Sequence, residues 1–130
     1  MAFAYVVRCT FDDAHTRDAF FAWLRDRHVP DVMASGALDG EILLVDTPTA
    51  TEVRYRFASR EAFDAYEHGP ATARRQEGLD ALAKLGVAPE RGVIFTRWTG
   101  VLQGPTGVRG SGALQGPTSS PDASNAPSAR

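Results

Sequence analysis

The order in which the spacing of apolar residues changes along the chain constrains the fold more than any other feature. Segments with hydrophobic residues at every second position, typical of strands, alternate with segments in which they recur every three or four residues, typical of helices. The order is strand, helix, strand, strand, helix, strand, over residues 3–11, 13–36, 38–45, 51–58, 59–85 and 93–99, the last reaching toward residue 102.

Right-handed crossovers applied to this order give two split βαβ units. The fold class predicted from them is α+β. We expect a ferredoxin-like domain, in which a four-stranded antiparallel sheet carries both helices on one face.

Residues 20–38 read as an amphipathic helix that a proline interrupts. A residue that precedes proline is disfavoured in the α region, and Val29 therefore predicts that the first helix ends near His28. Pro30 is expected to begin a new short helix, in which its missing N–H costs nothing, and Gly36 to end it.

Helix-start and helix-stop residues delimit the other helical segments. Asp13 offers an N-cap oxygen to the first helix, and Ser59 offers one to the second. The second is expected to break at Gly69 and Pro70 and to resume from Ala71.

The chain length of 130 residues and the hydrophobic content of 43% predict one domain with its own core. We place this domain at residues 1–102. Residues 103–130 are rich in glycine, proline and serine and poor in apolar bulk. They are predicted to form a disordered tail, because they offer too little apolar surface to offset the entropy of ordering.

Composition also limits the partners and the cellular location. The formal net charge of −2 argues against nucleic acid as a ligand, and no apolar run is long enough for a membrane helix. The single cysteine, Cys9, cannot form an internal disulfide and alternates with apolar neighbours, so it reads as a buried hydrophobic residue. Without a signal-peptide pattern, we expect a cytoplasmic protein.

One face of the expected sheet is left without helices. It would carry Val6, Ile94 and Trp98, and an exposed apolar face of this kind is typical of a surface that binds another protein. Face-to-face homodimerisation is the simplest solution, and a homodimer is therefore expected.

The segment from Trp23 to Leu38 resembles domain of unknown function 4286, a family of small bacterial proteins. The shared pattern is a tryptophan, a histidine, an aliphatic residue, a proline, an acidic residue and a later glycine; it is carried here by Trp23, His28, Val29, Pro30, Asp31 and Gly36. The strand at Tyr55–Phe57, the helix at Ser59–Tyr66 and a histidine before a helix break are also similar. The resemblance covers roughly residues 4–102.

This resemblance implies a dimeric α+β barrel, in which two ferredoxin-like sheets close into a barrel. It implies no activity, because the family is named for lacking one. Relatives in the superfamily include cofactor-free monooxygenases, haem-degrading enzymes, lactone isomerases and ligand-sensing domains, so the fold alone does not choose a function.

Two histidines are the candidate catalytic residues. His28 is expected at a helix C-terminus, where it acts either as an acid, base or ligand anchor or as a helix-ending residue bonded to a carbonyl. His68 repeats the spacing of a histidine two residues before a proline. The third histidine, His15, is expected to be solvated.

Four arginines that each lie within an expected strand, Arg8, Arg54, Arg56 and Arg97, suggest a ligand-binding set. Arg8, Arg54 and Arg56 share the face opposite the aromatic stripe, where they need carboxylate partners such as Glu41 or Glu52, or else an anionic ligand. An ordinary salt-bridged dimer interface is the alternative. The candidate ligand-binding residues are Arg8, Arg54, Arg56, Tyr55 and Trp98.

No metal site and no cofactor are predicted, because three histidines and one cysteine lack metal-ligand spacing. Three functions stay open. The protein is a binder of a small organic and possibly anionic molecule, a cofactor-independent monooxygenase or isomerase, or a structural subunit whose barrel is filled with side chains.

Overall fold

The computed structural model describes residues 2–87 and 93–104. The elements follow one another as β1 (Phe3–Phe11), α1 (Ala14–Trp23), the π-helical turn η1 (Leu24–His28), α2 (Val29–Ala34), β2 (Asp39–Val45), β3 (Ala50–Phe57), α3 (Arg60–Glu67), α4 (Ala71–Lys84) and β4 (Val93–Val101). The expected order of strands and helices is confirmed. Most of the predicted tail lies outside the described residues.

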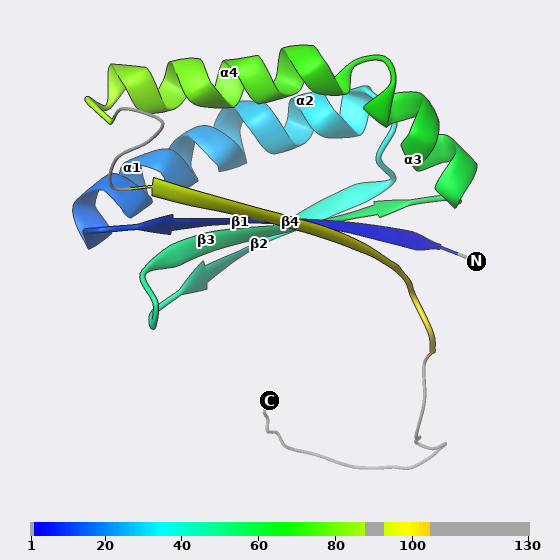
Figure 1. Cartoon of the computed structure of the whole chain (residues 1–130), viewed down its shortest axis with the longest axis horizontal. Coiled ribbons are helices and arrows are strands. Elements are labelled where there is room, and N and C mark those ends of the chain that lie inside the picture. Colours follow the sequence, from blue (N-terminus) through cyan, green and yellow to red (C-terminus); the bar gives the residue numbers. More distant parts are fainter. Residues whose placement is uncertain (1, 88–92, 105–130) are drawn as a thin grey trace.

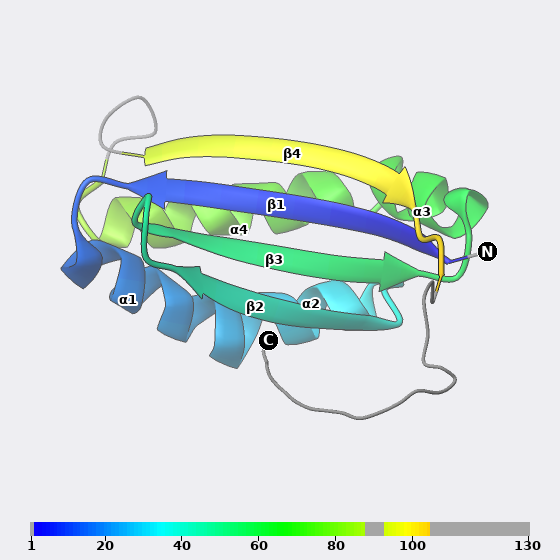
Figure 2. The same cartoon turned by 90° about the horizontal axis from the view of Figure 1, so that it is seen from below.

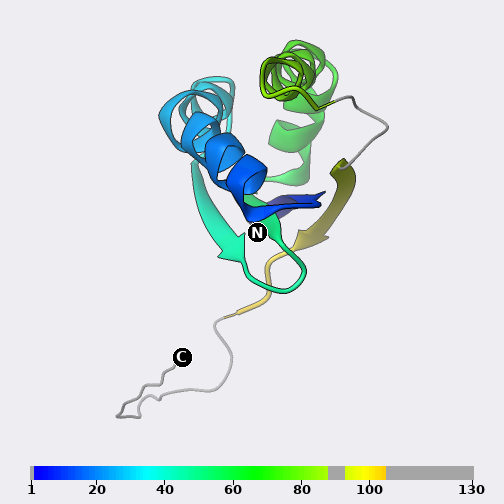
Figure 3. The ribbon, with the colours of Figure 1, turned by 90° about the vertical axis from the view of Figure 1, so that its left-hand side faces the viewer.

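The four strands form one antiparallel sheet in the order β2-β3-β1-β4. All helices lie on one face of this sheet, with α1 and α2 beside α3 and α4 (Figure 1 and Figure 3). The other face has no helix on it within residues 2–87 and 93–104 (Figure 2). This is the predicted ferredoxin-like α+β architecture.

Side chains on the helix-facing side of the sheet form the core. Phe3 and Phe57 from the sheet, and Leu82 from α4 opposite them, are among the most deeply buried residues of this core. Three rows across β3, β1 and β4 matter for the site: Tyr55, Tyr5 and Thr99; Val53, Val7 and Arg97; Thr51, Cys9 and Phe95. Because alternate residues of a strand face the same side, these rows all point toward the helices.

The first helical segment does not end near His28, and that prediction is wrong. The chain continues as a helix through Pro30, and Val29 keeps helical angles of φ −63° and ψ −45°. Between Leu24 and His28 the helix widens into a π-helical turn, in which the Val29 N–H donates to the Leu24 carbonyl. A proline lacks an N–H and crowds the carbonyl four residues earlier, and a wider turn accommodates it without a break.

The predicted caps and stops are present. Thr16 N–H donates to the Asp13 carboxylate at the start of α1, and Ala62 N–H donates to Ser59 Oγ at the start of α3. Gly36 has a positive φ of 138° where the chain leaves α2, a conformation that favours glycine.

A close approach between β2 and its neighbours requires Gly40. A Cβ at this position would lie 2.9 Å from Val29 Cγ1 and 3.1 Å from a ring carbon of Tyr55. The missing side chain lets β2 lie directly against the residues that support one wall of the site.

None of the helices in the described part of the chain is long and apolar enough to cross a bilayer.

Candidate functional site

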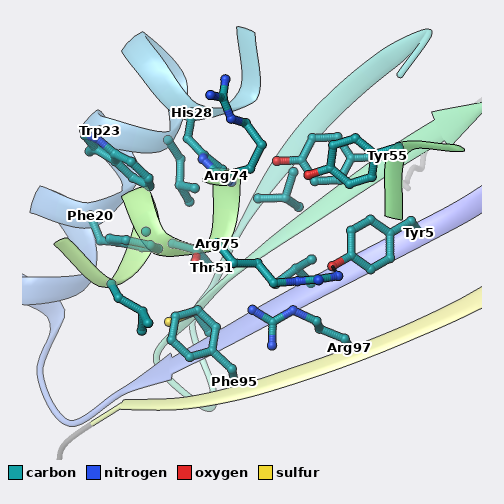
Figure 4. A pocket seen from close by; sticks show the side chains of 17 residues that line it. Tyr5, Phe20, Trp23, His28, Thr51, Tyr55, Arg74, Arg75, Phe95 and Arg97 are labelled. Carbon is teal, nitrogen blue, oxygen red and sulfur yellow. Dashed lines mark hydrogen bonds between the residues drawn. The ribbon is translucent and has the colours of Figure 1, made fainter. Parts of the chain in front are cut away.

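A cavity of about 250 Å³ lies between the helices and the sheet. Its walls come from β1, β3 and β4 on the sheet side and from α1, η1, α3 and α4 on the helix side (Figure 4). The lining combines aromatic and aliphatic side chains with a small number of polar groups. This is the usual composition of a pocket that binds small molecules.

One end of the cavity is apolar. Phe20, Trp23 and Leu24 from the first helical segment face Cys9 and Phe95 from the sheet. Burial raises the pKa of the Cys9 thiol to about 12, so the sulfur is protonated at neutral pH. Cys9 therefore acts as a wall of the cavity and not as a nucleophile, as its alternation with apolar residues predicts.

The charged groups of the cavity are all cationic. Arg74 and Arg75 reach it from α4, and Arg97 reaches it from β4. No aspartate or glutamate lines the cavity among the residues described by the structure. A group of arginines without carboxylates beside them creates a positive potential, which favours an anionic ligand.

The arginines differ in how far their charge is already neutralised. Arg74 pairs with Glu77 at 2.8 Å, and Arg75 pairs with Glu67 at 2.6 Å, both outside the cavity. Arg97 contacts the Phe95 ring, 5.1 Å from its centroid, and has no ion-pair partner within residues 2–87 and 93–104.

Three buried side-chain atoms in the cavity wall have no hydrogen-bonding partner in the described part of the protein. They are His28 Nδ1, the Tyr55 hydroxyl and Arg74 Nε. A buried polar group without a partner costs about 1–3 kcal/mol, so such groups are uncommon and their presence together calls for an explanation. The three side chains that carry these atoms all line the same cavity, and acceptor oxygens of a ligand are the kind of partner that the atoms lack.

His28 is held against the cavity by the π-helical turn. Its ring stacks on Trp23 with centroids 4.7 Å apart and planes 22° apart. Burial, together with the nearby charges of Arg74 and Arg97, lowers the pKa of His28 to about 4, although Asp31 opposes the shift. The imidazole is therefore neutral at pH 7 and can accept a proton.

The predicted site residues separate into three places. His28 and Tyr55 line the cavity. His68 is exposed at the end of α3, where its ring nitrogen lies 2.9 Å from the Asp64 carbonyl. His15 is exposed, as predicted.

The remaining predicted residues, Arg8, Arg54, Arg56 and Trp98, lie on the sheet face without helices. Arg8 and Arg54 bracket Glu52, at 2.8 Å and 2.7 Å, and Arg56 pairs with Asp39.

Glu52 is only 4% exposed. Burial opposes its ionisation, but the hydrogen bonds from the two arginines hold the pKa of Glu52 below its usual range. The arginines of this face thus already have carboxylate partners. On the same face Ile94 and Trp98 are 67% and 43% exposed.

Sequence reasoning missed the cationic part of the cavity. Arg97 lies two residues after Phe95 and four after Val93 on β4, and both of these residues face the core. The alternation of side chains along a strand alone could therefore have placed Arg97 on the side of the helices. Arg74 lies three residues after buried Ala71 and four before buried Gly78, the spacing of the inward stripe of α4. Both signals were available in the sequence.

The fold and the cavity together define the class of protein: a ferredoxin-like α+β domain with an internal pocket. No protein-family model matches the chain, and no curated protein matches it in sequence. The resemblance to domain of unknown function 4286 therefore stays a prediction.

Solved structures share the fold. A dimeric ferredoxin-like protein from an uncultured marine organism is 15% identical, with a TM-score of 0.55 over 82% of this chain and 99% of the other. A monooxygenase from the gene ActVA-Orf6 of Streptomyces coelicolor, in complex with nanaomycin D, is 17% identical, with a TM-score of 0.54 over 79% and 92%. A putative antibiotic biosynthesis monooxygenase from Nitrosomonas europaea is 20% identical, with a TM-score of 0.51 over 82% and 94%.

These structural similarities show the α+β fold alone. Any chemistry has to be inferred from the residues of the site itself. Within the described residues no group of three or more histidine, cysteine, aspartate or glutamate side chains is placed to hold a metal ion.

Proposed function

We propose that the cavity binds a small organic molecule that carries a negative charge. The observation that carries this proposal is the cationic, carboxylate-free lining, combined with three buried polar atoms that lack a partner. A charge moved out of water is stabilised only where opposite charge and hydrogen bonds replace its hydration. Arg97 supplies the charge, and the three unpaired atoms supply the hydrogen bonds.

The apolar end of the cavity supports the organic part of the ligand. Phe20, Trp23 and Phe95 offer ring faces and edges, and burial of a ligand's apolar surface contributes roughly 25 cal/mol per Å². An inorganic anion would leave this surface uncovered. The lining therefore favours a molecule with an apolar body and one charged end.

Thermal unfolding with matched probes tests the proposal. Octanoate, benzoate and 2-naphthoate are each compared with the corresponding neutral amide. A ligand at 100 times its Kd stabilises the folded protein by about 2.7 kcal/mol, which raises Tm measurably. At least one acid is expected to raise Tm more than its amide. Equal effects of acids and amides would contradict an anionic ligand.

Variants of two arginines locate the binding. Arg97→Gln is expected to weaken acid binding about tenfold or more, because a hydrogen bond to a charged group contributes about 1.5–3 kcal/mol. Arg25→Gln is the matched control, since Arg25 is exposed on η1 and pairs with Asp26. Equal losses in both variants would place the binding outside the cavity.

A second candidate function is a cofactor-independent oxygenase or isomerase. The observation that favours it is the neutral His28 imidazole beside Arg74 and Arg97, which pairs a proton acceptor with cations that stabilise an oxyanion. The likeness to monooxygenases of the same fold supports it.

An oxygen electrode tests this candidate with 1-naphthol, whose conversion by one O₂ to 1,4-naphthoquinone and one water is balanced. Turnover is expected to fall about 100-fold in His28→Gln, because general-base catalysis contributes at least that factor. Binding of 1-naphthol by the same variant, measured from Trp23 fluorescence, separates lost chemistry from lost binding. Consumption of O₂ at the original rate by the variant would exclude His28 as the base.

We also propose that the chain forms a homodimer through the sheet face that carries Ile94 and Trp98. The exposure of these two side chains supports the assembly, as does the dimeric state of one structural neighbour.

The remaining alternative, a structural subunit without a ligand, loses support because a cavity lined by His28 and arginines favours a binding or catalytic role.

A further inference from the structure

The three unpaired atoms of the cavity lie on three different elements. His28 comes from η1, Tyr55 from β3 and Arg74 from α4. Tyr55 belongs to the sheet side of the cavity, as does Arg97, whereas His28 and Arg74 reach the cavity from the helix side (Figure 4). The Tyr55 side chain is 3% exposed, so its hydroxyl cannot turn to bulk water.

Arg74 Nε and the Tyr55 hydroxyl can donate hydrogen bonds. His28 Nδ1 is also a donor when it carries a proton. Arg74 Nε donates only, and a tyrosine hydroxyl that meets an anion donates to it. If the anionic group of the ligand were a phenolate, its single oxygen would have to accept all three hydrogen bonds. A carboxylate has two oxygens with about four lone-pair positions, and it can meet donors that approach from separate elements.

The charge of the cavity selects a monoanion. Arg74 and Arg75 already pair with glutamates, and Arg97 is the cation of the lining that has no ion-pair partner in the described ranges. A doubly charged phosphate would bring one negative charge more than this arginine balances. The excess charge would then have no unpaired cation beside it among the described lining residues, which disfavours a dianion.

The volume sets the size of the apolar body. An apolar protein cavity of about 150 Å³ binds benzene. The present cavity is about 250 Å³, which leaves room for a second fused ring and a carboxylate beyond one benzene ring. Trp23 and Phe20, whose ring centroids are 5.3 Å apart, offer a stacking surface at the apolar end.

We infer that the ligand is a two-ring aromatic carboxylate whose carboxyl group is held by His28, Tyr55 and Arg74. This inference rests on the proposed function, because it specifies the anion and the body that the same cavity binds. The rings lie toward Phe20 and Trp23, and Arg97 balances the charge.

Calorimetric titration of the full chain tests the inference and leaves Trp98, on the proposed dimer face, unchanged. The probes are 2-naphthoate, 2-naphthol, 2-naphthamide and benzoate. We expect 2-naphthoate to bind at least tenfold more tightly than each of the other three. Equal or tighter binding of 2-naphthol or 2-naphthamide would overturn the carboxylate, and equal binding of benzoate would overturn the second ring.

Conservative variants test two of the three contacts. Tyr55→Phe removes one hydroxyl, and Arg74→Lys keeps the charge but removes Nε. Each is expected to weaken 2-naphthoate about tenfold or more while changing the affinity of 2-naphthamide little.

Tyr5→Phe is the matched control, because the Tyr5 hydroxyl already accepts a hydrogen bond from Arg75 at 3.4 Å. It should weaken 2-naphthoate less than Tyr55→Phe does, and the reverse order would overturn the assignment.

Failure of the inference and failure of the proposed function give different results. If octanoate or benzoate binds and depends on Arg97 while 2-naphthoate does not bind, the inference is wrong and the proposed function stands. If no acid binds in preference to its amide, both are wrong.

Discussion

The folded chain is expected to lose about 3 kcal/mol of stability as the pH falls from about 6.5 to 4, through His28 alone. The pKa of His28 is about 4 in the folded protein, against about 6.5 for an ordinary histidine. The unfolded chain therefore takes up a proton in this range and the folded chain does not. Stability increases with pH wherever the unfolded state binds more protons, so it falls as the pH falls.

The physical cause is the position of the imidazole. Burial beneath Trp23 removes water from the ring, and the charges of Arg74 and Arg97 add repulsion for the imidazolium. Asp31 on α2 attracts the proton but does not reverse the shift. Desolvation is the largest of these effects, and it disfavours the charged form of the ring.

Urea unfolding at a series of pH values measures this contribution. His28→Gln and His28→Leu are both expected to flatten the profile between pH 6.5 and 5, above the range in which carboxylates titrate. The comparison uses the slope, because either variant also changes stability at pH 7. His15→Gln, at an exposed position on α1, should keep the original slope. An unchanged slope in both His28 variants would show that this histidine titrates normally.

Local sequence signals predicted the fold because each agreed with the others. Period-two alternation in β1 and β3, the caps Asp13 and Ser59, and the break at Gly69 all act over a few residues, and the final structure keeps each of them. The topology followed because right-handed crossovers leave few ways to connect such elements.

The error at Pro30 has a clear cause. The statistical preference against a helical residue before proline is a local effect, and burial of neighbouring side chains competes with it. Val29 and Val32 are both buried, and a helix that stopped at His28 would have lost these contacts. The π-helical turn retains them and places His28 at the cavity, which no rule on prolines anticipates.

The site was predicted in part, because strand arginines can serve either face. His28 and Tyr55 were named and line the cavity, whereas Arg8, Arg54 and Arg56 lie on the opposite face beside carboxylates. The alternation of side chains along a strand shows which residues share a face of the sheet. Only the packing of the helices determines which of the two faces borders the cavity. The cavity itself depends on how the side chains of distant elements fill that space, and no short segment encodes it.

Binding of 2-naphthoate is expected to be accompanied by uptake of one proton at His28. A carboxylate about 4 Å from the imidazole attracts the imidazolium by about 4 kcal/mol at an effective dielectric constant of 20. The carboxylate would therefore raise the pKa of His28 above its value of about 4 in the free protein. The proton also turns Nδ1 into a donor toward the carboxylate.

Affinity for 2-naphthoate should therefore fall as the pH rises through the raised pKa of His28, by about tenfold or more between pH 5 and pH 8. The ligand contributes little to this change, because a carboxyl group with a pKa near that of aspartate, about 4, stays largely ionised in this range. His28 is thus the group within the cavity that accounts for the change.

Calorimetry in buffers with different heats of ionisation counts the protons directly. At pH 6 the heat should depend on the buffer as required for uptake of about one proton per ligand, because His28 is neutral before binding and protonated after it. His28→Gln should bind with a heat independent of the buffer and an affinity nearly constant with pH, and His15→Gln should behave as the original chain. Binding without proton uptake in the original chain would mean that His28 meets the carboxylate as a neutral donor, with its Nδ1 proton already in place.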